Sequence, residues 1–138
     1  MKVVLDTNII MDALQERQPF DIEAKEILKR SQGNDEFACL FTANAVTDIF
    51  YLYSKARGMN SAKAAVGFLL TTYDVVSVTR EDCVIALSLI IEDFEDALIV
   101  VCSQKAGADY IVTRDEKFLQ EKSPIKVISP KALVAMLM

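Results

Sequence analysis

Short apolar runs alternate with helical patterns along the whole chain, and this alternation constrains the fold more than any other feature. The runs consist mainly of β-branched, aromatic and other apolar residues, the composition typical of strands. Most are apolar at successive positions rather than at every second one, as expected of parallel strands that are covered on both faces. We expect strands over Lys2–Leu5, Phe37–Phe41, Val75–Val78, Tyr110–Val112 and Lys126–Ile128.

Helical patterns fill the segments between these runs. Ser61 and Thr79 are suited to cap the starts of two helices, and Gly107 follows the end of a third. Strands that alternate with helices predict an α/β fold, namely a three-layer α/β/α sandwich around a mainly parallel five-stranded sheet. We expect helices over Ile9–Glu16, Asp21–Gln32, Ala43–Arg57, Ser61–Thr72, Arg80–Ile90, Asp96–Lys105, Glu116–Gln120 and Lys131–Leu137.

The composition is that of an ordinary globular domain. Of the 138 residues, 52% are apolar and 25% are charged, and no linker, low-complexity tract or repeat divides the chain. We therefore expect a single domain over residues 1–138. Asp6 interrupts the apolar start and no apolar run could span a bilayer, so we expect neither a signal peptide nor a membrane segment. Cys39, Cys83 and Cys102 lie in apolar contexts and fit the reduced thiols of a cytoplasmic protein.

The acidic residues are the main candidates for chemistry, because the chain contains no histidine. Asp6 directly follows the first apolar run, and Asp115 lies shortly after the fourth. Asp48 lies within a helical pattern. Asp96 begins an apolar stretch that is typical of a buried helix, where an isolated charge is costly. Carboxylates are ligands of hard divalent cations, so these four acids predict a Mg²⁺ or Mn²⁺ site.

The expected topology would bring these acids together. In open parallel sheets, ligands bind beyond the carboxyl ends of the strands. If the first and fourth strands are neighbours, Asp6 and Asp115 lie in one crevice. The helix that begins at Asp96 leads into the fourth strand, so we expect its start at the same edge of the sheet.

Most of these acids also have an ordinary explanation as helix caps. Asp6 or Asn8 is suited to cap the helix after the first strand, and Asp115 is suited to cap the helix that follows it. If Asp93 is an N-cap, Asp96 falls at the third helical position, where an acid favours the positive end of the helix. The sequence alone leaves both explanations open.

Asp48 has the weakest structural explanation. On a helical wheel it lies about 40° from Leu52, at the edge of a stripe that we expect to be buried. An acid beside a core stripe is seldom explained by solubility alone. The residues of the expected stripe are Ala45, Ile49, Leu52 and Ala56.

The chain resembles a PIN domain, the metal-dependent ribonuclease fold that includes VapC-type toxins. The resemblance runs essentially from end to end, and it lies in the order and spacing of its motifs rather than in any one of them. One departure is that the second acid of the family is commonly Glu, whereas this chain has Asp48. The matching segments are Val4–Asn8, the helical Asp48, Asp93–Ala97 and Ala108–Asp115.

The resemblance also implies a mechanism. One or two Mg²⁺ or Mn²⁺ ions would bind the scissile phosphate and activate a water for in-line attack, which leaves a 5′-phosphate and a 3′-hydroxyl. Asn8 and Thr113 would orient a water or a carboxylate, and Asp93 is a supporting acid that competes with Asp96 for the inward position. The implied catalytic, metal-binding acids are Asp6, Asp48, Asp96 and Asp115.

RNA is the expected substrate, although the net charge of −5 weighs against binding of nucleic acid by bulk charge alone. Lys55, Arg57 and Arg114 adjoin the acid-bearing segments, so we expect them to hold the RNA backbone. The resemblance also points to an antitoxin protein partner and to a homodimer. The expected dimer faces are Ser61–Thr72 and Ala132–Met138.

Three alternative functions differ in what they require of the sequence. A non-catalytic PIN-like domain that binds RNA or a protein is the main alternative, although all four acids are present. A phosphatase of the haloacid-dehalogenase type requires a second Asp two residues after the first, where this chain has Asn8. A receiver domain requires an acceptor Asp after the third strand, and the run Val75–Val78 is followed by Thr79.

Overall fold

The computed structural model describes all residues from Met1 to Met138. Its centre is a sheet of five parallel strands in the order β3-β2-β1-β4-β5. This confirms the predicted fold class. It also confirms that the first and fourth strands are neighbours, with Leu5 paired to Val112. The strands are β1 (Lys2–Leu5), β2 (Ala38–Thr42), β3 (Asp74–Val76), β4 (Tyr110–Val112) and β5 (Lys126–Ile128).

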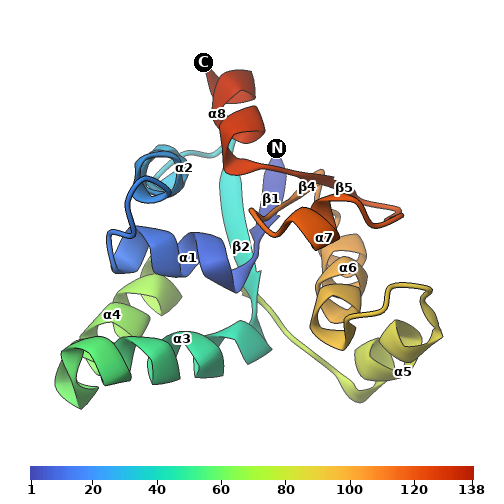
Figure 1. Cartoon of the computed structure of the whole chain (residues 1–138), viewed down its shortest axis with the longest axis horizontal. Helices are drawn as coiled ribbons and strands as arrows, with labels where there is room; N and C mark the ends of the chain where they lie inside the picture. Colours follow the sequence, from blue (N-terminus) through green and yellow to red (C-terminus); the bar gives the residue numbers. More distant parts are fainter.

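Helices cover both faces of the sheet and complete the three layers (Figure 1). One face carries α1, α2, α3, α4 and α8, and the other carries α5, α6 and α7. None of these helices is long and apolar enough to cross a membrane. The helices are α1 (Thr7–Leu14), α2 (Asp21–Ser31), α3 (Ala43–Arg57), α4 (Met59–Thr72), α5 (Arg80–Ser88), α6 (Phe94–Ala106), α7 (Glu116–Leu119) and α8 (Pro130–Leu137).

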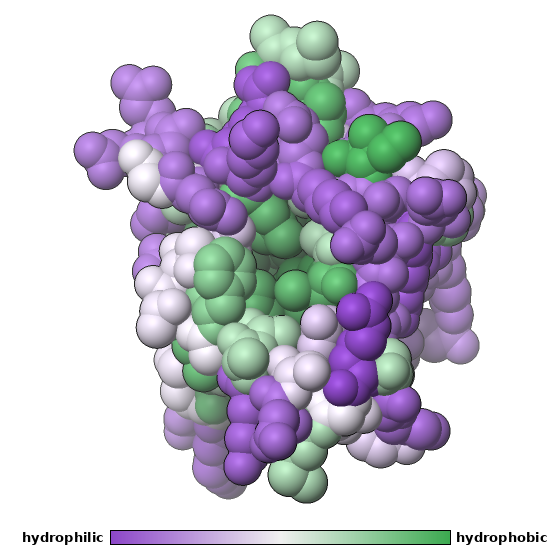
Figure 2. Space-filling view, turned by 90° about the vertical axis from the view of Figure 1, so that its left-hand side faces the viewer, coloured by the Kyte–Doolittle hydropathy of each residue, from purple (hydrophilic) through white to green (hydrophobic).

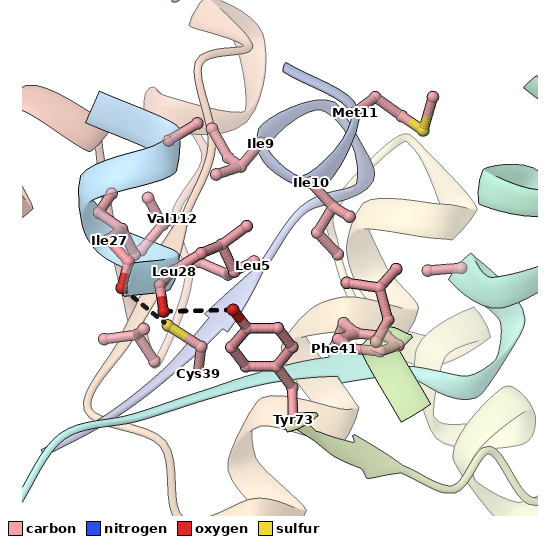
Figure 3. Close-up of a cluster of buried hydrophobic side chains, with 14 of the residues drawn as sticks. Leu5, Ile9, Ile10, Met11, Ile27, Leu28, Cys39, Phe41, Tyr73 and Val112 are labelled. Atoms are coloured by element: carbon pink, nitrogen blue, oxygen red, sulfur yellow. Dashed lines mark hydrogen bonds between the residues drawn. The ribbon is translucent and has the colours of Figure 1, made fainter. Parts of the chain in front are cut away.

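Successive residues of the strands enter two separate cores, because side chains alternate between the faces of a sheet. In β1, Val3 and Leu5 pack under α1 and α2, whereas Val4 packs under α6. Figure 3 shows the first core, where the Tyr73 hydroxyl donates a hydrogen bond to the backbone oxygen of Leu28 at 3.2 Å. The continuous apolar runs predicted from the sequence therefore reflect burial on both sides.

Helix α6 is the most deeply buried helix of the second core. Every residue from Asp96 to Ser103 is buried, as the apolar stretch predicts. The helix is capped at its start by Asp93 and ends at Gly107, whose φ of 68° is left-handed. This left-handed conformation favours glycine, and it turns the chain directly into β4.

Three predicted helix starts are shifted by two residues, and one of them is that of α6, which begins at Phe94 rather than Asp96 because Asp93 is its N-cap. Helix α1 begins at Thr7 rather than Ile9, because Asp6 is already its N-cap. Helix α4 begins at Met59 rather than Ser61, so Ser61 is not a cap. Gly58, with a φ of 85°, ends α3 and directly precedes α4. Only a residue that tolerates this φ allows so short a connection.

Candidate functional site

The carboxyl ends of β1 and β4 place Asp6 beside Thr113. The Asp6 backbone N–H donates to the Val112 oxygen at 3.0 Å, which extends the strand pairing by one residue. The buried Thr113 hydroxyl donates to Asp6 Oδ2 at 2.8 Å. Asn8 Nδ2 donates to the same carboxylate oxygen at 3.4 Å and to Thr113 Oγ1 at 3.3 Å. Two polar side chains thus fix the orientation of the Asp6 carboxylate.

Asp6 also caps α1, so the structural and functional interpretations of this residue do not compete. Its Oδ1 accepts a hydrogen bond from the Thr7 N–H at 2.8 Å. Burial raises the pKa of Asp6, and the charges of Asp115 and Asp93 raise it further, whereas the hydrogen bonds from Thr113 and Thr7 lower it. The net effect is a raised pKa, so the surroundings of Asp6 disfavour its ionisation when no cation is nearby.

The start of α6 supplies Asp93 and Asp96. Asp93 Oδ1 accepts the Asp96 N–H at 3.1 Å, which confirms Asp93 as the N-cap. Asp96 is only 8% exposed, and its carboxylate forms no hydrogen bond or ion pair. Burial raises the pKa of Asp96 to about 7, with further contributions from the charges of Asp93, Asp6, Asp115 and Glu95. Because the side chain of Asp93 is used as the helix cap, Asp96 is the acid of this pair that faces the interior.

Asp115 lies at the start of α7, on the exposed side of the cluster. Its Oδ1 accepts the Lys117 N–H at 3.1 Å, as predicted for a cap. Its own N–H donates to Thr113 Oγ1 at 3.1 Å, so Thr113 connects the segments that carry Asp6 and Asp115. The charge of Asp115 raises the pKa values of both Asp6 and Asp96, which places the carboxylates within electrostatic reach of one another.

Asp48 faces the same crevice, but the stripe predicted for its helix was wrong. Leu52 is 38% exposed and Ala56 is exposed. The residues of α3 that pack on the core are Ala45, Val46, Ile49, Phe50 and Tyr53. The buried stripe is rotated toward Tyr53, because α3 packs against α4 as well as against the sheet. Asp48 therefore lies away from the stripe and faces the crevice together with Leu52.

Glu95 is a member of the site that the sequence analysis missed. It lines the crevice with Asp48. Burial raises the pKa of Glu95, and the neighbouring carboxyl group of Asp48 raises it further. The cap at Asp93 is the signal that could have identified it, because a cap places both residues 95 and 96 in the first turn of α6.

Asp6, Asp48 and Glu95 line a pocket of about 360 Å³, whereas Asp96 and Asp115 do not belong to its lining. Two larger hollows, of about 600 and 550 Å³, lie around Pro124 at the opposite, amino-terminal edge of the sheet. The residues that line the pocket between the acids are Asp6, Thr7, Asn8, Met11, Arg17, Asp48, Tyr51, Leu52 and Glu95.

The chemistry of the donors fits a hard divalent cation. No group of three or more acidic or cysteine side chains forms a ready coordination shell in the present side-chain arrangement. The Asp96 carboxylate has no hydrogen-bond or ion-pair partner in a residue that is 8% exposed, and Asn8 Oδ1 is a buried acceptor with no hydrogen bond. A Mg²⁺ or Mn²⁺ ion would relieve the repulsion between the carboxylates. The acidic side chains that line the pocket, Asp6, Asp48 and Glu95, offer only carboxylate oxygens, which favours these ions over Zn²⁺.

The three basic residues predicted to hold RNA lie in different surroundings. The Lys55 ammonium lies 5.2 Å from the centre of the ring of Tyr51, which lines the pocket. Arg57 is exposed in the last turn of α3. The Arg114 guanidinium donates to the buried Asp12 at 2.6 and 3.0 Å and lies 4.1 Å from the centre of the Phe20 ring. Arg114 therefore has a structural role beside any role in binding.

Comparison with known proteins identifies the family and the fold. A family model described as "PIN domain" matches residues 2–117. No curated protein matches the chain by sequence. Several solved structures share the fold at low sequence identity.

A toxin–antitoxin complex from Klebsiella pneumoniae is 20% identical, with a TM-score of 0.68 over 93% of this chain and 97% of that chain. The Mycobacterium tuberculosis protein VapC20, described as a sarcin–ricin loop cleaving toxin, is 17% identical, with a TM-score of 0.67 over 84% and 92%. DNA-bound VapBC from Salmonella typhimurium is 13% identical, with a TM-score of 0.69 over 94% and 98%. At these identities the likeness establishes the fold.

Proposed function

The chain belongs to the PIN domain family, and we propose that it is a metal-dependent endoribonuclease that acts as the toxin of a toxin–antitoxin pair. The observation that carries this proposal is the largely buried Asp96, whose carboxylate has no hydrogen-bond or ion-pair partner, in the same acidic cluster as Asp6. A largely buried carboxylate that has neither a hydrogen-bond donor nor a cation beside it lowers the stability of the folded state. In a protein that binds a divalent cation at this point, the same carboxylate is a ligand.

In this proposal Asp6, Asp48, Asp96 and Asp115 hold the cation. A bound Mg²⁺ or Mn²⁺ supplies charge stabilisation at the phosphate and eases the ionisation of the attacking water. Thr113 and Asn8 keep the Asp6 carboxylate in one orientation. Asp93 fixes the first turn of α6, and with it the position of Asp96.

Glu95 compensates for the shorter second acid. Asp48 is one methylene shorter than the Glu that is common at this position in the family. Glu95 lines the pocket with Asp48 and so brings a second carboxyl group to it.

The proposed substrate is RNA and the proposed location is the cytoplasm, where the three free cysteines remain reduced. Cleavage would leave a 5′-phosphate and a 3′-hydroxyl. Lys55, beside the pocket residue Tyr51, supports binding of a polyanion despite the acidic net charge. The main alternative remains a PIN-like domain that binds RNA or a protein without cleavage.

An antitoxin partner is part of the proposal. The solved relatives from Klebsiella pneumoniae and Salmonella typhimurium are described as complexes of this kind. Figure 2 shows an apolar hollow on the side of the molecule where α1, α2 and α4 lie. Such a hollow is suited to an apolar segment of a partner. Co-expression with the product of a small reading frame next to this gene, followed by co-purification, tests this part.

Cleavage of a structured RNA mixture in Mg²⁺ or Mn²⁺, compared with chelator, tests the activity. We expect wild-type cleavage only with metal, and background cleavage for Asp6→Asn and Asp96→Asn. Asp35→Asn is the matched control, because Asp35 is an exposed acid in a loop outside the site. RNA binding without cleavage in either metal would favour the non-catalytic alternative.

Thermal melts test the metal site without relying on activity. A cation that binds the folded protein and not the unfolded chain stabilises it, by about 2.7 kcal/mol at a hundred times the Kd. We expect millimolar Mn²⁺ to raise the Tm of the wild type and of Asp35→Asn, but not that of Asp96→Asn. An unchanged wild-type Tm across the titration would indicate that the acids serve only as caps.

A further inference from the structure

Arg17 is the one cationic side chain that lines the acidic pocket. It lies in the turn after α1, where its backbone N–H donates a hydrogen bond to the backbone oxygen of Asp12 at 3.1 Å. Its guanidinium donates twice to Gln15 Oε1, at 3.1 and 2.9 Å. Because Gln15 is neutral, these two bonds fix the guanidinium without cancelling its charge.

The nearest acid leaves most of this charge free. Asp12 lies 3.8 Å from Arg17 Nη1, but it makes its two short bonds to Arg114. Gln15 in turn donates to the Leu52 oxygen at 3.4 Å, which connects the end of α1 to α3. Arg17 is thus held between two helices with its side chain 36% exposed.

Tyr51 provides a flat aromatic surface in the same pocket. It is 58% exposed, although a tyrosine ring in a folded protein usually buries much of its apolar area. It lies three residues after Asp48 on α3, so both side chains lie on one side of the helix. Lys55, one turn further, places its ammonium 5.2 Å from the ring centre and adds positive charge there.

We propose that Arg17 and Tyr51 form a subsite for one unpaired nucleotide next to the cleaved bond. Arg17 binds the phosphate with its planar fork of donors, and Tyr51 stacks on the base. This inference rests on the proposed ribonuclease function and deepens it by naming two residues that would position the substrate, Arg17 for a phosphate and Tyr51 for a base.

Base pairing decides whether such a subsite can be used. In an A-form duplex the bases are stacked on one another, and only unpaired bases are free to stack on an aromatic side chain. Stacking on Tyr51 accepts any base, because every base has an aromatic face. We therefore expect a strong preference for single-stranded RNA and a weak preference among sequences.

Binding of a short, unstructured, fluorescently labelled RNA in chelator tests the subsite, since no metal-dependent cleavage occurs there. We expect Arg17→Gln to weaken binding and to reduce the slope of log affinity against log salt by about 0.7, the value for one single-strand phosphate contact. Arg17→Lys keeps the charge but loses the fork, so its affinity should lie in between. Arg80→Gln is the matched control, because Arg80 is exposed at the start of α5.

The aromatic contact has its own variants. Tyr51→Leu should weaken binding about tenfold or more, as loss of one base–aromatic stack does. Tyr51→Phe keeps the ring and should bind like the wild type. Phe68→Leu, which changes an exposed aromatic residue on α4, controls for a general effect of apolar surface. Thermal melts of all variants verify that each is folded.

Several results would overturn the subsite. They are wild-type affinity in both Arg17→Gln and Tyr51→Leu, absence of wild-type binding at low salt, and binding of a blunt RNA duplex as tightly as of the single strand. If the variants affect only binding of a co-purified protein partner, the surface serves a protein and not RNA. If the wild type cleaves RNA but the variants bind normally, the subsite is wrong and the ribonuclease function stands. If the variants lose RNA binding but no metal supports cleavage by the wild type, the subsite stands and the ribonuclease function is wrong.

Discussion

Asp96 illustrates how a single residue can link stability, pH and metal binding. In the folded protein its pKa is raised to about 7 by burial and by the surrounding carboxylates, whereas an unfolded aspartate has a pKa of about 3.9. Between these values the folded state retains a proton that the unfolded state has released. The unfolding free energy therefore falls as the pH rises through this range, and the stabilisation is lost above pH 7.

This shift predicts that the metal-free protein is less stable at pH 8 than at pH 5. Asp96→Asn removes the titrating group, so in chelator its Tm should fall much less over the same range. Thermal melts at several pH values measure the difference, with Asp35→Asn as a control that should keep the wild-type dependence. An equally steep fall in Asp96→Asn would assign the effect to other groups.

Arg114 carries a second prediction at the residue scale. Asp12 is 1% exposed, and Arg114 supplies its two short hydrogen bonds. Removal of one partner leaves a buried charge, which costs about 3 kcal/mol or more in buried pairs. We expect Arg114→Ala to lower the urea midpoint accordingly, whereas Arg57→Ala should change stability by less than about 0.5 kcal/mol, as surface changes usually do. Similar midpoints for the two variants would contradict this role of Arg114.

The Arg114–Asp12 contact stabilises the fold, so a test of RNA binding by Arg114 has to separate loss of binding from unfolding. Loss of RNA binding in Arg114→Ala is informative only at temperatures where the variant is folded. A reduced salt slope in the folded variant would support backbone binding by Arg114 in addition to its bond with Asp12.

At the scale of elements, caps determine where the helices begin and where the acids lie. Asp93 caps α6, and it also adds negative charge beside Asp96. Its two effects on stability therefore have opposite signs, because the cap stabilises the helix and the charge repels its neighbours.

Two substitutions separate these effects. Asp93→Asn keeps a capping oxygen and removes the charge, so we expect unchanged or increased stability in chelator. Asp93→Ala loses the cap, and it should be less stable than Asp93→Asn by about 1 kcal/mol. Urea unfolding of both variants in chelator measures the difference. Equal stability would show that the Asp93 cap contributes little.

The elements that sequence predicted well are those whose signals are local. The strand runs, the Thr79 and Asp93 caps and the Gly107 end are fixed by neighbouring residues, and all are present in the structure. The rotation of α3 was mispredicted because it depends on packing against α4, which no periodic pattern in α3 encodes.

Two site residues were missed for a related reason. Arg17 lies in an irregular turn and reaches the pocket only through its bonds to Gln15. Glu95 lies in a run of acids whose directions depend on the cap at Asp93. The direction of a side chain in three dimensions decided both cases, and the residue type alone did not.

At the scale of the whole molecule, the exposed apolar side chains are unevenly distributed. Helix α4 exposes Met59, Phe68 and Leu70, and α8 exposes Met136, while Met138 follows it. The largest group lies on α5, the loop that follows it and the first residue of α6. Its members are Val84, Ile85, Leu87, Ile90 and Phe94, with Leu87 75% and Ile90 101% exposed.

This distribution leads us to expect that a homodimer forms through α5 and the start of α6 rather than through α4 and α8. Apolar groups of this kind mark interaction surfaces, and twofold dimers are the commonest soluble assembly. Phe94 directly precedes Glu95 and Asp96, so pairing here would bring two acidic sites toward one groove. Leu87→Asp with Ile90→Asp should yield a monomer in light scattering at micromolar concentration, whereas Phe68→Asp should leave the wild-type dimer intact. A dimer that survives the α5 changes but not Phe68→Asp would place the interface on α4, and a monomeric wild type would exclude both faces.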